Sequence, residues 1–526
     1  MLYGAQGRLR WRAPQALLIP EFLHYHYDEG MRPPGGSEPI ILPGFIAGRD
    51  GGPPLYQQIY ASFRNAILTG QWTAGQRAPS SRALARELQI SRLPVLNAYA
   101  QLLAEGYLEA RPGSGTYIAR RLRARSRPRA PIRKEPAAPP LISRQIRRYL
   151  PSTRQEATPW VRGWGAFGLH QPALELFPFS AWSKLLSRHV AATRMQDLRR
   201  IDPMGWLEFR AAIAEYLRSA RGLECAPEQI MVVSGSQQAL DIIARTLLNP
   251  GQAVWMEEPG YWLARHALRT AGARLVPVAV DEEGLEVGRG MRAAPHARLV
   301  YATPAHHFPL GATLSAARRI QLLEWARKSQ AWIVEDDYDG EYRYESPPVA
   351  TLYGMDRQER VIYVGTFSKV MFPSLRLGYI VLPRALVPAM CAVRYGMDIF
   401  PPFLSQQVMT GFLRDGHFAR HIRRTRLAYR ERRQALIEAL RPLAQSGLEL
   451  RGAAAGLHVS LLLPPACDDI RLAQAAAEEK LWLWPLSGFY NSRQRQRPGF
   501  VLGYGSVTPE EMPAAVGQLQ KIIQNH

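Results

Sequence analysis

Hydrophobic residues between 161 and 526 follow two alternating patterns, helical spacing and short continuous apolar runs. Short continuous apolar runs fit strands whose two faces are both buried. Strands of this kind alternating with helices predict an α/β domain with a mostly parallel sheet that helices cover on both faces. The clearest runs are residues 230–233, 253–256, 299–301, 332–334 and 361–364.

Residues 54–119 show the pattern of a separate compact module. Ser80 and Ser81 can cap a second helix and Ser91 a third, in which Pro94 is tolerated because it lies in the first turn. Two short stretches joined by the glycine turn 113–115 predict a β-hairpin. Three helices and a hairpin together predict a winged helix-turn-helix. The buried face of its first helix is expected to contain Leu55, Ile59, Phe63, Ala66 and Ile67.

Two further segments lack any sustained period. Residues 1–53 are rich in Gly and Pro, and we expect a disordered extension, unless translation begins at Met31. Residues 120–160 read as a basic, Pro-rich linker, with eleven Lys and Arg between 120 and 148 against Glu135 alone. This stretch contributes about +10 of the net charge, either as a solvated tether or as an arm that contacts DNA phosphates.

Composition narrows the class of protein. The 526 residues exceed a usual single core, 47% of them are hydrophobic, and the net charge of +22 suggests a polyanionic partner: nucleic acid, an anionic membrane surface or an acidic protein. Cys225, Cys391 and Cys467 are too scattered for a disulfide framework or a metal knuckle, so we predict no metal ion. There is neither an 18-residue apolar run nor a signal peptide, which predicts a cytoplasmic protein without a membrane partner.

The compact module resembles the GntR-type winged helix. The matching strings are 54–59, 75–77, 79–82, 84–85, 91–92, 98–99, 105–108 and 111–117. The resemblance implies a double-stranded DNA operator as partner. It assigns base or phosphate contacts to Arg82 and Arg92 near the recognition helix, although either arginine alone could be a solvated surface charge. Leu93-Pro94 stands where relatives commonly carry Asn-Thr. The other implied DNA-contacting positions are Ser80, Ser81, Ser91 and the turn at Gly113.

In the large domain, a lysine follows an apolar strand. Thr366 precedes Lys369, and Arg376 comes seven residues later. A nucleophilic amine with hydroxyl and guanidinium groups for a phosphate suits a pyridoxal phosphate site, although a buried lysine can also be a paired structural cation. Acidic residues end the strand at 332–334, the turn 234–239 lies between a strand and a helix, and Tyr261 could cover a cofactor ring.

These pieces in this order resemble fold-type I aminotransferases. The resemblance makes Lys369 the Schiff-base lysine, Asp336 the partner of the pyridine nitrogen, and Tyr338 the phenol near the cofactor's 3-oxygen. Ser236 and Gln237 match the phosphate-binding turn, and Tyr261 the stacking ring. The arginine for the substrate carboxylate is missing from its aligned position, and Arg497 is the nearest candidate, with Arg495 behind it.

A GntR-like winged helix joined to an aminotransferase-like domain resembles the MocR-type transcriptional regulators over about residues 54–526. The resemblance implies a domain-swapped, head-to-tail homodimer that binds pyridoxal phosphate and senses an amino compound or pyridoxal phosphate itself. One alternative is a catalytically active aminotransferase with an appended DNA-binding domain. Another is a DNA-packaging protein, which would leave the residues around Lys369 unexplained.

Overall fold

The computed structural model describes residues 53–120, 143, 159–199, 201–345, 349–491 and 496–525. The chain divides into two compact units at about residue 140. We call residues 53–120 the small unit and residues 159–525 the large unit. Almost all of the predicted extension (1–53) and linker (120–160) lies outside the described residues.

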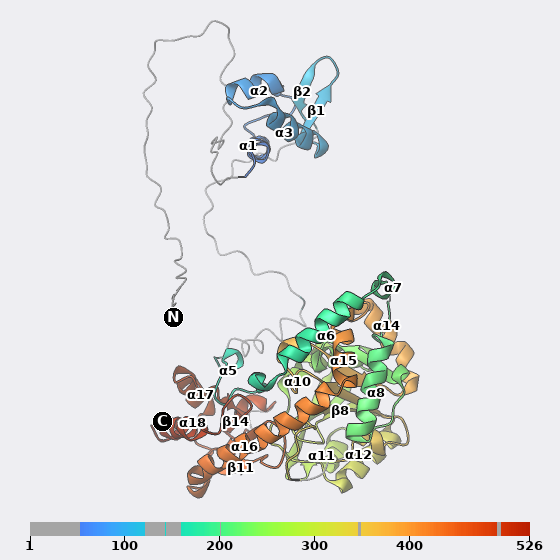
Figure 1. Ribbon diagram of the computed structural model, residues 1–526, viewed down its shortest axis with the longest axis vertical. Helices are drawn as coiled ribbons and strands as arrows, with labels where there is room; N and C mark the ends of the chain where they lie inside the picture. Colours follow the sequence, from blue (N-terminus) through green and yellow to red (C-terminus); the bar gives the residue numbers. More distant parts are fainter. Residues whose placement is uncertain are drawn as a thin grey trace, which may run out of the picture. The chain divides into compact units, whose positions relative to one another are not determined.

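The small unit has the predicted three helices and hairpin (Figure 1). They are α1 (Leu55–Leu68), α2 (Ser81–Glu87), α3 (Arg92–Ala104), β1 (Leu108–Arg111) and β2 (Gly115–Ile118). Phe63 on α1 is fully buried, with its ring 5.1 Å from that of Trp72 and 5.3 Å from that of Tyr99. Burying a side chain of this size stabilises the fold by about 2–3 kcal/mol. The predicted face of α1 is therefore the face that holds the unit together, with Leu55 half-buried at its edge.

The large unit is built on an eight-stranded sheet of order β3-β10-β9-β8-β7-β4-β5-β6. The strands β9, β8, β7, β4 and β5 run parallel, whereas β10 is antiparallel to both of its neighbours. Each predicted apolar run lies in one of these strands, which confirms the mostly parallel sheet. The bounds are β3 (Ile230–Val233), β4 (Ala253–Glu258), β5 (Arg274–Asp281), β6 (Gly284–Leu285), β7 (Leu299–Ala302), β8 (Trp332–Asp337), β9 (Val361–Thr366) and β10 (Gly378–Val381).

Helices cover both faces of this sheet. Met256 packs with helices α9, α10 and α14, while its neighbour Trp255 points to the opposite face and stacks on Trp325 of α12, with ring centroids 3.7 Å apart. Because both faces are buried, the strands read as continuous apolar runs rather than alternating ones. These helices are α9 (Ser236–Leu247), α10 (Trp262–Thr270), α11 (Val287–Ala293), α12 (Ala316–Ser329), α13 (Leu352–Met355) and α14 (Val387–Met397).

A smaller antiparallel sheet, of order β11-β12-β14-β13, completes the large unit. Its strands are β11 (Glu449–Arg451), β12 (His458–Leu462), β13 (Trp484–Pro485) and β14 (Gly499–Gly503). The remaining helices are α5 (Pro159–Arg162), α6 (Phe179–Ala192), α7 (Met195–Leu198), α8 (Leu207–Arg221), α15 (Phe403–Arg414), α16 (His417–Gln445), α17 (Asp469–Glu478) and α18 (Met512–Asn525). Within the described ranges, no helix has the length and apolar character needed to cross a membrane.

Candidate functional site

Lys369 lies just beyond the carboxyl end of β9, next to the carboxyl end of β8. The register of the two strands pairs Asp336 with Val364, so the acidic end of β8 and the lysine meet at one edge of the sheet. Burial lowers the pKa of Lys369 to about 7, although Asp336 and Asp339 favour its charged form. A lysine with this pKa is largely a neutral amine in mildly alkaline solution, which is the form that acts as a nucleophile.

Asp336 is a buried carboxylate with one oxygen free. Its Oδ2 accepts a hydrogen bond of 2.7 Å from the hydroxyl of Tyr301, while Oδ1 has no partner among the described residues. Burial raises the pKa of Asp336 to about 6. An unpaired buried oxygen costs free energy unless a ligand donates to it. A protonated ring nitrogen is such a donor, so Asp336 fits a pyridine cofactor.

The start of α9 lies next to the guanidinium of Arg376. Gly235 occupies the N-cap position with φ +103°, and Ser236 and Gln237 open the helix. A Cβ at Gly235 would lie 3.3 Å from the guanidinium of Arg376, which is exposed. The free amides of a helix N-terminus and a nearby arginine together suit a phosphate group. The side chain of Gln237 itself donates to the carbonyl of Leu263 at 3.3 Å.

Thr366 ends β9, three residues before Lys369, and the two predicted tyrosines both pack on Phe308. Thr366 Oγ1 accepts a hydrogen bond of 3.2 Å from the amide of Ser368. The ring of Tyr261, at the start of α10, meets Phe308 edge to face with centroids 5.7 Å apart. Tyr338 also meets Phe308 edge to face, with centroids 5.9 Å apart. A flat cofactor ring placed here would therefore have aromatic neighbours.

The sequence did not single out four side chains near this pocket, which are Tyr301, His306, Asp339 and His458. Tyr301 binds Asp336, and His306 lies 3.0 Å from both the Tyr338 hydroxyl and the Asp339 carboxylate. His458 lines a cavity of about 20 Å³ together with Tyr338 and Lys369. The double histidine 306–307 and the third acid of the run 336–339 were the only local signals for this group.

Arg497 is not part of this pocket. Its guanidinium forms an ion pair of 3.0 Å with Glu449, and its side chain is about half exposed. It is not among the residues that line the cavity beside Lys369. Arg495 lies outside the described residues. A role for Arg497 in binding an effector carboxylate stays a prediction, and it would require the ion pair with Glu449 to break.

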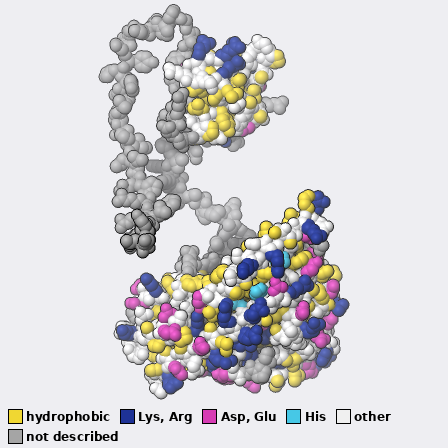
Figure 2. Space-filling model, in the orientation of Figure 1, with side chains coloured by type: hydrophobic (Ala, Val, Ile, Leu, Met, Phe, Trp, Pro, Cys, Tyr) yellow, Lys and Arg dark blue, Asp and Glu magenta, His cyan; other side chains and the backbone are white. Residues whose placement is uncertain are grey.

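Most of the predicted DNA-contacting residues lie at the start of α2 and at the start of α3. Ser80 caps α2 by accepting a hydrogen bond of 3.1 Å from the amide of Ala83. Ser81 accepts one of 3.1 Å from Nε of Arg92, which links α2 to α3. Arg82 is exposed, and Figure 2 shows basic side chains gathered over α2. A helix N-terminus with serine hydroxyls and arginines is a typical phosphate-binding surface.

Three more positions of the small unit bear on the predicted DNA contacts. Ser91 occupies the N-cap position of α3, and its hydroxyl makes no capping hydrogen bond. Leu93 follows and is 64% exposed. Gly113, with φ +74°, forms the exposed turn between β1 and β2.

Comparison with known proteins matches both units to families. The model of bacterial regulatory proteins of the gntR family matches residues 55–118, and that of aminotransferase class I and II matches residues 171–518. The probable rhizopine catabolism regulatory protein MocR of Rhizobium meliloti is 39% identical over 477 residues, which cover 90% of this chain and 95% of the relative. The chain belongs to the MocR-type transcriptional regulators.

This regulator has further relatives with both parts. The HTH-type transcriptional regulator TauR of Rhodobacter capsulatus is 30% identical over 92% of this chain and 100% of its own length. The large unit resembles the α-aminoadipate aminotransferase LysN of Thermus thermophilus, with TM-score 0.67 and 26% identity over 73% of this chain and 97% of that one. That structure contains N-(5'-phosphopyridoxyl)-L-leucine. The predicted family, fold class and regulatory function are thus confirmed.

Proposed function

We propose that this regulator binds pyridoxal 5'-phosphate at Lys369 and controls transcription in response to an amino compound or to the cofactor itself. The observation that carries the proposal is the unpaired Oδ1 of buried Asp336 close to the depressed-pKa amine of Lys369. Asp336 would face the ring nitrogen of the cofactor, and the amine of Lys369 would react with its aldehyde.

The residues around Lys369 have complementary roles in this proposal. The amides of Ser236 and Gln237, with Thr366 and Arg376, bind the phosphate. Tyr261 covers the ring, and Tyr338 donates toward its 3-oxygen. Bound there, pyridoxal phosphate supplies an aldehyde carbon that reacts with amines. The deep burial of Asp336 strengthens its interaction with a cationic ring nitrogen, because few water dipoles screen the pair.

The small unit supplies the DNA contacts. Ser80, Ser81 and Ser91, with Arg82, bind operator phosphates, while Arg92 and Leu93 reach base edges in the major groove. The turn at Gly113 lies at or near the minor groove. Because such contacts release counterions, operator affinity falls steeply as the salt concentration rises.

The regulator works as a homodimer in this proposal, with the head-to-tail arrangement that the family resemblance implies. Exposed apolar side chains on and just after α6 and α7 support an interface with a second copy. Figure 2 shows hydrophobic side chains along the edge of the large unit that these helices form. They are Phe179, Leu186, Val190, Met195, Leu198 and Ile201, each at least 39% exposed. Light scattering after Leu198→Asp should give a smaller mass than for the unsubstituted chain.

Two measurements on the purified full-length chain test the proposal. Added pyridoxal phosphate should give a visible absorption band that survives dialysis, and the chain should bind a specific DNA fragment selected from its genome. A chain that stays colourless with added cofactor would overturn cofactor binding. Steady-state turnover with an amino donor and a 2-oxoacid would favour the aminotransferase alternative.

A further inference from the structure

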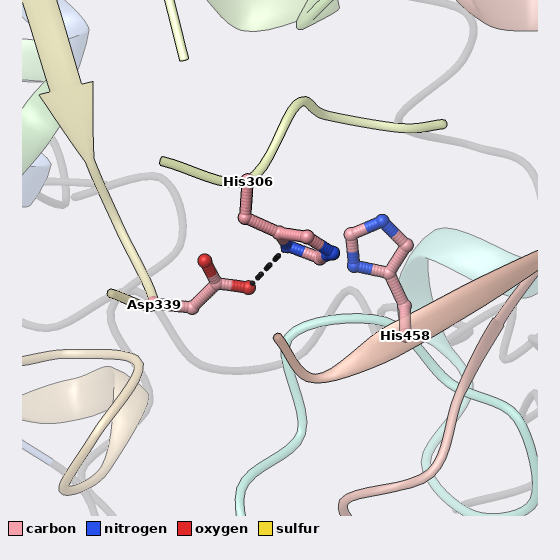
Figure 3. Close-up of side chains that lie close together, drawn as sticks. All are labelled: His306, Asp339 and His458. Atoms are coloured by element: carbon pink, nitrogen blue, oxygen red, sulfur yellow. Dashed lines mark hydrogen bonds and ion pairs between the residues drawn. The ribbon is translucent and has the colours of Figure 1, made fainter. Parts of the chain in front are cut away.

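Three buried side chains from distant parts of the large unit meet next to the cofactor pocket. His306 follows β7, Asp339 follows β8, and His458 opens β12. Their exposed fractions are 2%, 1% and 3%. One nitrogen of each histidine and one oxygen of Asp339 all lie within 4.8 Å of one another (Figure 3). Two imidazoles and a carboxylate are ligands that divalent transition metals accept.

Hydrogen bonds fix the orientation of both imidazoles. Nδ1 of His306 lies 3.0 Å from Oδ2 of Asp339, and Nε2 of His458 lies 2.9 Å from the carbonyl oxygen of Pro309. A carboxylate and a carbonyl only accept, which assigns the protons to these two nitrogens. The Tyr338 hydroxyl, also 3.0 Å from Nδ1 of His306, is then a second acceptor. Metal-binding histidines usually donate their other ring N–H to a carboxylate or a backbone carbonyl in this way.

The two remaining ring nitrogens therefore carry lone pairs. Nε2 of His306 is buried and has no hydrogen-bond partner among the described residues. Figure 3 shows this side of the His306 ring turned toward the ring of His458, and the two ring centroids are 5.0 Å apart. A buried acceptor without a donor, such as Nε2 of His306, costs free energy. A cation between the two rings removes this cost.

We propose that His306 and His458 bind a divalent transition-metal ion, Zn²⁺ being the best match, with Asp339 orienting His306 through its Nδ1 and supplying negative charge. Zn–N distances are about 2.0–2.1 Å, and the candidate ligand atoms already lie within 4.8 Å of one another. Gly456 lies directly against the cluster: a Cβ there would come within 2.0 Å of the His306 ring and 2.6 Å of Asp339. Any larger residue would push the ligands apart.

The metal site opens toward the pocket beside Lys369. His458 lines the same cavity as Lys369 and Tyr338. The protein supplies the two ring nitrogens, so a tetrahedral ion keeps a position for water or for a ligand atom. An effector with an oxygen or nitrogen donor next to its reacting amine would occupy that position. The ion thus adds a second point of recognition for whatever binds at Lys369.

The test is a Zn²⁺ titration of the full-length, untagged chain after removal of metals by a chelator, with metal content read by mass spectrometry. We expect one tightly bound ion per chain, and at least a hundredfold weaker binding in His458→Gln. Asp339→Asn should weaken binding about ten- to a hundredfold. His296→Gln, at an exposed histidine, is the matched control and should leave the affinity unchanged.

Two outcomes would overturn the metal site. One is an unsubstituted chain that takes up no Zn²⁺. The other is a His458→Gln chain that still binds one equivalent. Circular dichroism of each variant checks folding. If His458→Gln does not fold, the visible absorption of Co²⁺ added to the unsubstituted chain decides instead. A spectrum typical of tetrahedral nitrogen and oxygen ligation supports the site, and one identical to aqueous Co²⁺ refutes it.

Discussion

Replacing Asp336 by Asn should stabilise the cofactor-free chain and weaken its binding of pyridoxal phosphate. The substitution keeps the size of the side chain, and its amide oxygen can still accept the hydrogen bond from Tyr301. Only the negative charge is removed. In the folded chain this charge is buried without a full set of partners, and in the complex it would face the cationic ring nitrogen of the cofactor.

The pKa of Asp336 sets the size of the first effect. Burial raises this pKa from 3.8 to about 6. At about 1.4 kcal/mol per pH unit, the gap corresponds to about 3 kcal/mol. Because the pKa is raised, the Asp336 carboxyl keeps its proton to a higher pH in the folded chain than in the unfolded chain. The free energy of unfolding therefore falls as the pH rises from 3.8 to about 6, and it stays low above that pH. Asp336→Asn removes this loss at neutral pH and has little effect below pH 3.8.

The second effect has the opposite sign. A hydrogen bond to a charged group contributes about 1.5–3 kcal/mol. The dissociation constant of pyridoxal phosphate should therefore rise about ten- to a hundredfold in Asp336→Asn. Denaturant unfolding of the cofactor-free chain and a spectroscopic titration with cofactor measure the two effects separately.

Asp337→Asn is the matched control, one residue further along β8. Asp337 pairs with Arg221, and both side chains are 3% exposed. Removing this charge leaves a buried guanidinium without its counterion and should destabilise the chain by about 3–5 kcal/mol. A destabilised Asp336→Asn, or one with unchanged cofactor affinity, would refute the role that we assign to Asp336.

Other substitutions test other parts of the site. Lys369→Ala should abolish the visible band of the cofactor complex. In the unsubstituted chain, the rate of cofactor capture should rise with pH through about 7, because the neutral amine of Lys369 increases there; a flat rate across roughly one pH unit on either side of that value would contradict this. Arg92→Ala should cost about 1–3 kcal/mol of operator affinity by removing a base contact. Anisotropy titrations at several salt concentrations measure that loss, and an unchanged affinity would exclude Arg92 from the interface.

The strands that the sequence predicted are those with continuous apolar runs. Ile230–Val233 was found with its observed bounds because both of its faces are buried. The antiparallel strand β10 follows Arg376 after one residue and is only four residues long, so no turn signal separates it from the preceding segment. Much of β5 is half-exposed near the edge of the sheet, which leaves it without a continuous apolar run.

The sequence predicted those residues of the candidate site that are close together along the chain and missed those that only the fold brings together. Lys369, Thr366 and Arg376 are close in sequence, so their spacing alone predicted a common site. Tyr301 reaches Asp336 across two neighbouring strands, and His458 reaches Pro309 from another sheet, 149 residues away. Contacts of this kind depend on strand order, which a single sequence does not reveal. His306, Asp339 and His458 are equally far apart in the sequence. Their meeting also depends on the fold, so no metal-binding pattern for them shows in the sequence.

The central claim is that the cofactor on Lys369 links the large unit to transcription. The most direct test is in vitro transcription from a promoter that the full-length chain selects, with and without pyridoxal phosphate, for the unsubstituted chain and for Lys369→Ala. Promoter occupancy is measured on the same samples by footprinting. We predict that the cofactor changes transcript levels with the unsubstituted chain and leaves them unchanged with Lys369→Ala, although both bind the promoter. Equal responses from the two chains would contradict the claim.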